Sequence, residues 1–114
     1  MEIREERAAD VLIVAPTGRL DTTTSTDLEK HLLGRLDANE RRLVVDLSGI
    51  EYVSSAGLRV LLLVAKRLRT TSGDLVLCGL GPAVRQVFEL AGFVSLFRLE
   101  ASRDQALARL AAPG

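Results

Sequence analysis

Short apolar runs that are typical of strands alternate with helical patterns along this chain. The runs cover residues 11–15, 43–47, 74–78 and 96–99, and a more polar segment at 3–7 can pair with the first of them as a hairpin. A hairpin followed by alternating helices and strands predicts an α/β fold with parallel, right-handed crossovers. We therefore expect a mixed sheet of four or five strands with four helices.

The four helices are predicted from apolar residues at steps of three and four, with capping residues at their ends. Their expected spans are about 26–38 behind hydroxyl caps at 22–25, a second helix opening at Ser54 and Ser55, a third from Pro82 to a left-handed Gly92, and a fourth at 102–110 capped by Ser102. The expected buried stripes of the first three are Leu28, Leu32, Leu33 and Leu36; Leu58, Leu61, Leu62, Ala65 and Leu68; and Val84, Val87, Phe88 and Ala91.

The length and charge of the chain limit its function. A chain of 114 residues fits a single domain over 1–114, of which we expect 111–114 to be a frayed tail. Fifteen basic residues balance fifteen acidic ones, so no strong global field favours nucleic acid or an anionic membrane surface. We expect a monomer, because no wide apolar stripe remains once the helices are assigned.

Few residues are suited to metal or redox chemistry. The single cysteine, Cys78, lies in an apolar run and is expected to be a buried thiol. The single histidine, His31, has no clustered ligands around it in sequence, so we predict no metal site and no cofactor. The first residues are charged, and the longest apolar run, 60–65, is too short to span a bilayer, which favours a cytoplasmic protein without membrane contact.

The segment 46–59 joins a predicted strand to a predicted helix through a polar turn, and it carries two adjacent serines. A serine there can cap the free backbone N–H groups of the first helical turn. A phosphate added there would face the same donors and the positive end of the helix dipole, with Arg59 one turn further on as a possible partner. The segment is chemically suited to a phosphorylation switch.

Three motifs in the same order resemble the STAS domain family, specifically the bacterial anti-sigma factor antagonists. They are Asp46-Leu47-Ser48 with Tyr52-Val53-Ser54-Ser55-Ala56-Gly57-Leu58, Gly18-Arg19-Leu20-Asp21, and the segment from Val84 to Phe93. The resemblance implies a four-helix, mixed-sheet domain. It also implies that the unphosphorylated form binds an anti-sigma factor, usually a serine kinase of the histidine-kinase-like ATPase fold, and so frees a sigma factor. Phosphorylation would break this complex, and a PP2C-like phosphatase would restore it.

Carried onto this chain, the resemblance makes Ser55 the phosphoacceptor and places Asp21 and Asp46 near it. Many family members have aspartate immediately before the acceptor, whereas this chain has Ser54, which is therefore an alternative acceptor. The residues expected to bind the partner are Asp21, Asp46, Ser54, Ser55, Ala56, Gly57, Leu58 and Arg59.

Two other functions fit parts of the sequence. A catalytic serine is disfavoured, because the serine pair lacks the flanking glycines of a nucleophile elbow and His31 has no evident orienting partner. The stronger alternative is a STAS-like binding module in another partner-switching, stress-complex or transporter-associated system, because one fold serves several functions.

Overall fold

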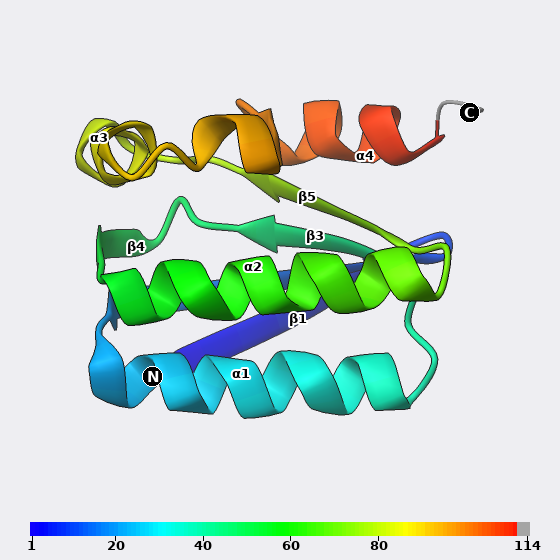
Figure 1. Cartoon of the computed structure of the whole chain (residues 1–114). Helices are drawn as coiled ribbons and strands as arrows, with labels where there is room; N and C mark the ends of the chain where they lie inside the picture. Colours follow the sequence, from blue (N-terminus) through cyan, green and yellow to red (C-terminus); the bar gives the residue numbers. More distant parts are fainter. Residues whose placement is uncertain (112–114) are drawn as a thin grey trace.

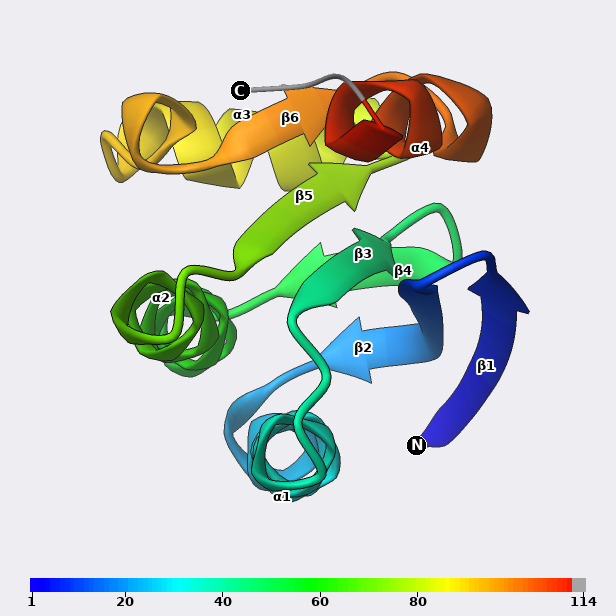
Figure 2. The ribbon, with the colours of Figure 1, turned by 90° about the vertical axis from the view of Figure 1, so that its right-hand side faces the viewer.

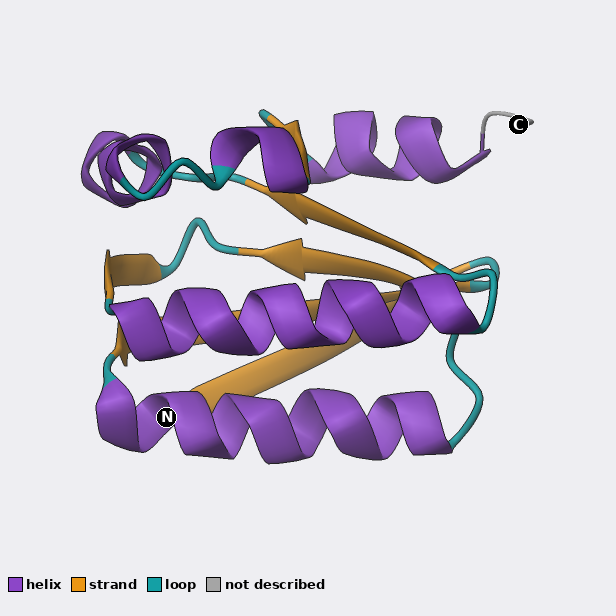
Figure 3. Cartoon of the chain, viewed as in Figure 1, coloured by secondary structure: helices purple, strands orange, loops and turns teal. Residues whose placement is uncertain are grey.

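The computed structural model describes residues 1–111. Within them, the strands are β1 (Glu2–Ala8), β2 (Val11–Leu20), β3 (Arg42–Asp46), β4 (Ile50–Val53), β5 (Asp74–Cys78) and β6 (Arg98–Glu100). The helices are α1 (Thr22–Asp37), α2 (Ser55–Thr70), α3 (Pro82–Leu90) and α4 (Arg103–Ala111), and a 3₁₀ turn covers Val94–Leu96. Figure 3 separates the helices from the strands by colour. The predicted α/β class with four helices is confirmed.

The strands form one mixed sheet in the order β1-β2-β3-β5-β6, with β4 paired to the second half of β2. Among the strand pairings of residues 1–111, only the β1–β2 hairpin is antiparallel; the others are parallel. β2 can serve two neighbours because it is ten residues long: its first half pairs with β3 and its last residues pair with β4. Gly18 lies at the change of partner with a φ of 103°, a conformation that glycine adopts without strain.

The central strands β3 and β5 are buried on both faces. α1 and α2 lie side by side over one face, and α4 covers the other (Figures 1 and 2). Leu43 and Val45 of β3 point into the larger cluster beneath α1 and α2, whereas Val44 belongs to the smaller cluster with Ala106 and Leu110 of α4. A strand covered on both sides has a continuous apolar run in its sequence, which is why β3 and β5 could be predicted as strands.

The largest correction to the sequence prediction is β4, a sixth strand that was expected to be part of a polar turn. Its burial pattern explains the error: Ile50 and Val53 are buried while Glu51 and Tyr52 are exposed, so the apolar residues do not alternate. Such a short segment becomes a strand because the extended end of β2 offers it a partner.

The start of α1 was also predicted wrongly. The helix begins at Thr22 rather than near Thr26, because the carboxylate of Asp21 accepts hydrogen bonds from the backbone N–H groups of Thr23 (3.0 Å) and Thr24 (2.9 Å). Aspartate is a strong N-cap, so the threonines that follow it belong to the first turn of the helix.

Smaller differences concern helix faces and the C-terminal third. Leu62 is only partly buried and Ala91 is exposed, while Val60 and Val64 are buried instead. The expected strand at 96–99 is Arg98–Glu100, because the residues before it form the 3₁₀ turn. The predicted left-handed Gly92 (φ 73°) and the Ser102 cap, whose hydroxyl accepts the Gln105 N–H at 3.2 Å, are confirmed. Of the predicted frayed tail, Ala111 closes α4, and 112–114 lie outside the described residues.

Candidate functional site

The two serines at the start of α2 have different roles. Ser54 is the N-cap: its backbone is extended, and its hydroxyl accepts the N–H of Gly57 at 3.2 Å. Ser55 is the first helical residue and is exposed. Within residues 1–111 the Ser55 hydroxyl makes no hydrogen bond, in contrast to that of Ser54.

The short strand β4 fixes the position of the serine pair. β4 ends at Val53, and the N–H of Ser54 then donates to the carbonyl of Leu20 at 2.8 Å. The start of α2 is therefore tied to the end of β2. Because the sequence prediction had no strand here, it could not explain how this turn is held.

Gly57 allows α2 to approach these strand ends closely. A Cβ atom on Gly57 would lie 2.8 Å from Cγ and Cδ2 of Leu20 and 3.0 Å from Cγ2 of Val53. The next residue, Leu58, is 3% exposed and packs in the core. Gly57 and Leu58, both expected to bind the partner, thus lie beneath the surface that carries Ser55.

Asp21 lies beside the serine pair. It follows Leu20, the residue whose carbonyl accepts the Ser54 N–H, and the first turns of α1 and α2 lie at the same end of the molecule (Figure 1). Hydrogen bonds from Thr24 and Thr23 lower the pKa of the Asp21 carboxyl, so it stays charged as a helix cap.

Asp46 is placed differently from the expectation of a partner contact. Its side chain is 9% exposed; one carboxylate oxygen accepts the Ser48 N–H at 3.0 Å, and the other accepts Nε of Arg103 at 2.6 Å. Arg103 also pairs with Glu6 of β1 at 2.9 Å. Asp46 therefore connects the end of β3 with α4 and β1, and its carboxylate is already occupied within the chain.

A shallow depression of about 330 Å³ lies between α1 and α2, next to Ser55. Arg59 lines it from α2 and Glu29 from α1, and Leu63 adds a partly exposed apolar surface. No carboxylate of residues 1–111 forms an ion pair with Arg59. The full lining is Thr22, Ser25, Thr26, Glu29, Ala56, Arg59, Val60 and Leu63.

Residues 2–106 match the STAS domain family. The chain belongs to that family. This STAS chain is 45% identical over 108 residues to BtrV of Bordetella bronchiseptica, whose name proposes it as an anti-sigma factor antagonist; the match covers 95% of this chain and 93% of BtrV. The predicted resemblance to this branch of the STAS family is confirmed.

Solved structures of similar proteins have the same fold. A crystal structure of an anti-sigma factor antagonist from Mycobacterium paratuberculosis has a TM-score of 0.89 and 28% identity, covering 97% of this chain and 94% of that one. A protein from Thermotoga maritima that is also proposed to be an anti-sigma factor antagonist has a TM-score of 0.92, covering 96% and 95% of the two chains. Its 18% identity supports the fold alone.

The described residues of this STAS domain give no support to a catalytic serine, a reactive cysteine or a metal site. Nε2 of His31 lies 2.5 Å from the carboxylate of Glu5 in β1, away from the serine pair, so no base is hydrogen-bonded to the Ser55 hydroxyl within residues 1–111. Burial raises the pKa of the Cys78 thiol to about 12, as expected for an inert core cysteine. In the described chain no cluster of three metal-binding side chains occurs, and no helix is long and apolar enough to cross a membrane.

The buried ion pair of Asp46 predicts a pH-dependent stability. Burial acts to raise the pKa of Asp46, but hydrogen bonds from Arg103 and the Ser48 N–H outweigh it and hold the pKa below its usual value. A lowered folded-state pKa stabilises the fold above the unfolded value of about 3.9, and this stabilisation is lost as the pH falls through the folded value.

Replacing Asp46→Asn should therefore lower the free energy of unfolding at pH 7 by about 1.5 kcal/mol, and the difference from wild type should shrink below about pH 4. Urea denaturation of both proteins between pH 7 and pH 2.5 measures it. Carboxyl groups that contact neither Asp46 nor Arg103 keep their surroundings in both proteins, so their contributions cancel in the difference. A difference that stays constant with pH would mean that the charge of Asp46 does not stabilise the fold.

Proposed function

We propose that this chain is an anti-sigma factor antagonist whose activity is switched at Ser55. Its unphosphorylated form binds an anti-sigma factor and so releases a sigma factor, and phosphorylation of Ser55 ends the binding. The partner is an anti-sigma factor that is also a serine kinase of the histidine-kinase-like ATPase fold. A PP2C-like phosphatase returns the chain to its binding state.

The observation that carries this proposal is the different state of the two serine hydroxyls. Ser54 uses its hydroxyl oxygen to cap α2, whereas Ser55 presents an exposed hydroxyl without a hydrogen bond within residues 1–111. A kinase needs such an accessible hydroxyl, so Ser55 is the better acceptor. The name of BtrV, 45% identical along nearly the whole chain, supports the same class of partner.

The surroundings of Ser55 give the switch a physical basis. A phosphate adds a charge of about −1.5 to −2 and three strong acceptor oxygens. In the free protein, the start of α2 and the guanidinium of Arg59, one turn further on, tolerate this charge. In a complex the phosphate would be enclosed between two surfaces, where desolvation and like charges oppose binding.

The first test is phosphorylation itself. The purified chain is incubated with ATP and a lysate of its own organism, and the phosphate is located by tandem mass spectrometry in wild type, Ser54→Ala and Ser55→Ala. We expect phosphate on Ser55 that disappears only in Ser55→Ala. Phosphate on Ser54 would move the switch to the cap residue. No phosphate on either serine, in a lysate with demonstrated protein kinase activity, would contradict the switch.

A further inference from the structure

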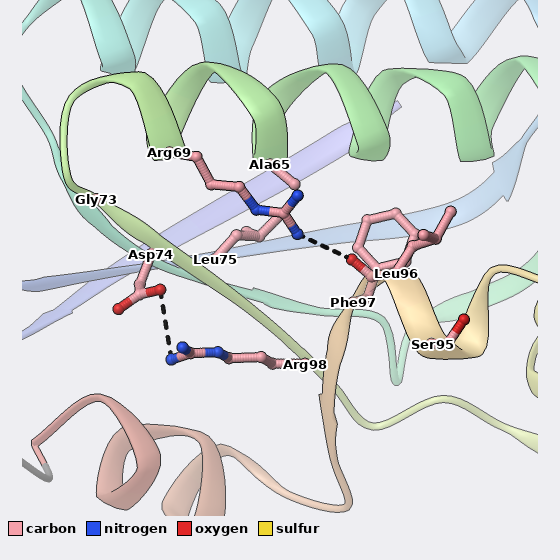
Figure 4. Close-up of a pocket in the computed structure, with 9 residues that line it drawn as sticks. All are labelled: Ala65, Arg69, Gly73, Asp74, Leu75, Ser95, Leu96, Phe97 and Arg98. Carbon is pink, nitrogen blue, oxygen red and sulfur yellow. Dashed lines mark hydrogen bonds and ion pairs between the residues drawn. The ribbon is translucent and has the colours of Figure 1, made fainter. Parts of the chain in front are cut away.

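A second hollow, of about 340 Å³, lies at the C-terminal end of α2, at the far end of this helix from Ser55 (Figure 4). Its volume is within the lower range of small-molecule sites. It is formed by α2, the start of β5, the 3₁₀ turn and β6. The lining residues are Ala65, Arg69, Gly73, Asp74, Leu75, Ser95, Leu96, Phe97 and Arg98.

The hollow results from a mismatch in strand length. β6 pairs with β5 only from Val76 to Cys78, so Asp74 and Leu75 at the start of β5 have no paired strand on that side. The chain before β6 instead turns away as the 3₁₀ turn at Val94–Leu96. The sheet edge therefore opens into a cavity beneath α2.

Two arginines enter this hollow from opposite sides (Figure 4). Arg69 of α2 donates one N–H to the carbonyl of Leu96 at 3.2 Å, which orients its guanidinium, and no carboxylate of residues 1–111 pairs with it. Arg98 of β6 lies 3.3 Å from Asp74, and both side chains are about half exposed, at 48% and 46%. The side chains of the hollow thus carry one excess positive charge.

The remaining lining combines polar Ser95 with the apolar side chains of Ala65, Leu75, Leu96 and Phe97. Leu75 is 7% exposed, and the ring of Phe97 meets Phe88 edge-on at 5.6 Å between centroids and Phe93 at 6.3 Å. Phe88 is fully buried, so the ring of Phe97 is held against a fixed neighbour. A ligand body that is apolar and flat would pack on these surfaces.

We propose that this hollow binds a small organic anion, with a carboxylate or phosphate head on Arg69 and Arg98 and an apolar body against Phe97 and Leu75. The guanidinium of Arg69 donates one N–H to the carbonyl of Leu96, and its other N–H groups remain available. Two parallel N–H groups of a guanidinium match the two oxygens of a carboxylate or phosphate. The anionic head of the ligand competes with Asp74 for Arg98. The Arg98–Asp74 ion pair is half exposed and therefore weak, so the ligand can displace it. This site is separate from Ser55 and does not depend on the switch.

The test is an NMR titration of the ¹⁵N-labelled full chain at constant ionic strength. Benzoate and phenyl phosphate are the probes; acetate and inorganic phosphate supply the head alone, and benzamide supplies the body alone. We expect saturable shifts around residues 65–75 and 95–98 with benzoate, phenyl phosphate or both, and which of them binds identifies the head. The proposal would be overturned if acetate or inorganic phosphate bound as tightly as benzoate or phenyl phosphate, or if the shifts lay elsewhere in the chain.

A pair of variants separates the site from general charge effects. Arg69→Gln removes the unpaired guanidinium and should weaken binding of the organic anion by about tenfold or more, the usual effect of losing a charged hydrogen bond. Arg67→Gln is the control, because Arg67 lies on the same helix but pairs with Asp37 at 3.3 Å outside the hollow. It should bind as wild type does. Equal loss in both variants, or none in Arg69→Gln, would refute the site.

Discussion

Replacing Ser55→Asp should lower the affinity of this chain for the proposed anti-sigma factor partner by about 100-fold or more, whereas Ser55→Ala should change it by less than about threefold. Ser55 is exposed, and its hydroxyl makes no hydrogen bond within residues 1–111, so alanine removes nothing that the fold needs. Aspartate places a charge where the proposed complex would enclose it. At an interface, two like charges that face each other, or one buried charge without a partner, oppose binding by several kcal/mol.

The loss should come from the interface and not from unfolding. A negative charge in the first turn of a helix interacts favourably with the helix dipole, so Ser55→Asp should leave α2 and the thermal stability of the chain intact. Circular dichroism and a melting curve check this point. Affinity is measured by calorimetry with the anti-sigma factor encoded in the same genome.

Ser102→Asp is a matched control for this experiment. Ser102 is also an exposed serine at a helix start, and its hydroxyl caps α4 on the opposite face of the sheet. The variant adds the same charge at a similar helical position, and aspartate caps as well as serine does. It should bind like wild type. Unchanged binding by Ser55→Asp would refute the proposed interface, and an equal loss in Ser102→Asp would indicate a general charge effect.

The second large effect is expected at Gly57. Gly57→Val should lower the free energy of unfolding by about 3 kcal/mol, because even the first carbon of a side chain would meet Leu20 at 2.8 Å and Val53 at 3.0 Å. The clash involves Cγ of Leu20, which moves less easily than the end of a side chain. Relief would require the first turn of α2, and Ser55 with it, to move away from the sheet.

Gly34 offers the matched comparison. It is also a helical glycine, in α1, but it is exposed and a Cβ atom there would meet nothing within 4 Å. Gly34→Val should remain within about 0.5 kcal/mol of wild type, because valine has a slightly better helix propensity than glycine. Urea denaturation of both variants gives the two values. Similar losses at the two positions would show that glycine at 57 is not needed for close packing.

The sequence by itself determined the fold class and the start of α2, where the candidate site lies. β3 and β5 are covered on both faces, so their apolar runs are continuous and can be recognised without a structure. The start of α2 could be placed at Ser54 and Ser55 because capping is local: the cap and the N–H group that it satisfies are three residues apart. The resemblance to the STAS family rested on three short segments, 46–48 with 52–58, 18–21 and 84–93.

Only the tertiary structure decided which residues of the segment 46–59 reach the surface. Three facts could not be predicted: β4 is a strand because β2 extends past β3, Asp46 is buried because Arg103, 57 residues further along the chain, reaches back to it, and Gly57 is needed because Leu20 lies against it. Each depends on a partner distant in sequence, and neither periodicity nor capping specifies such a partner. The distinction between a capping Ser54 and a free Ser55 likewise required the geometry of the turn.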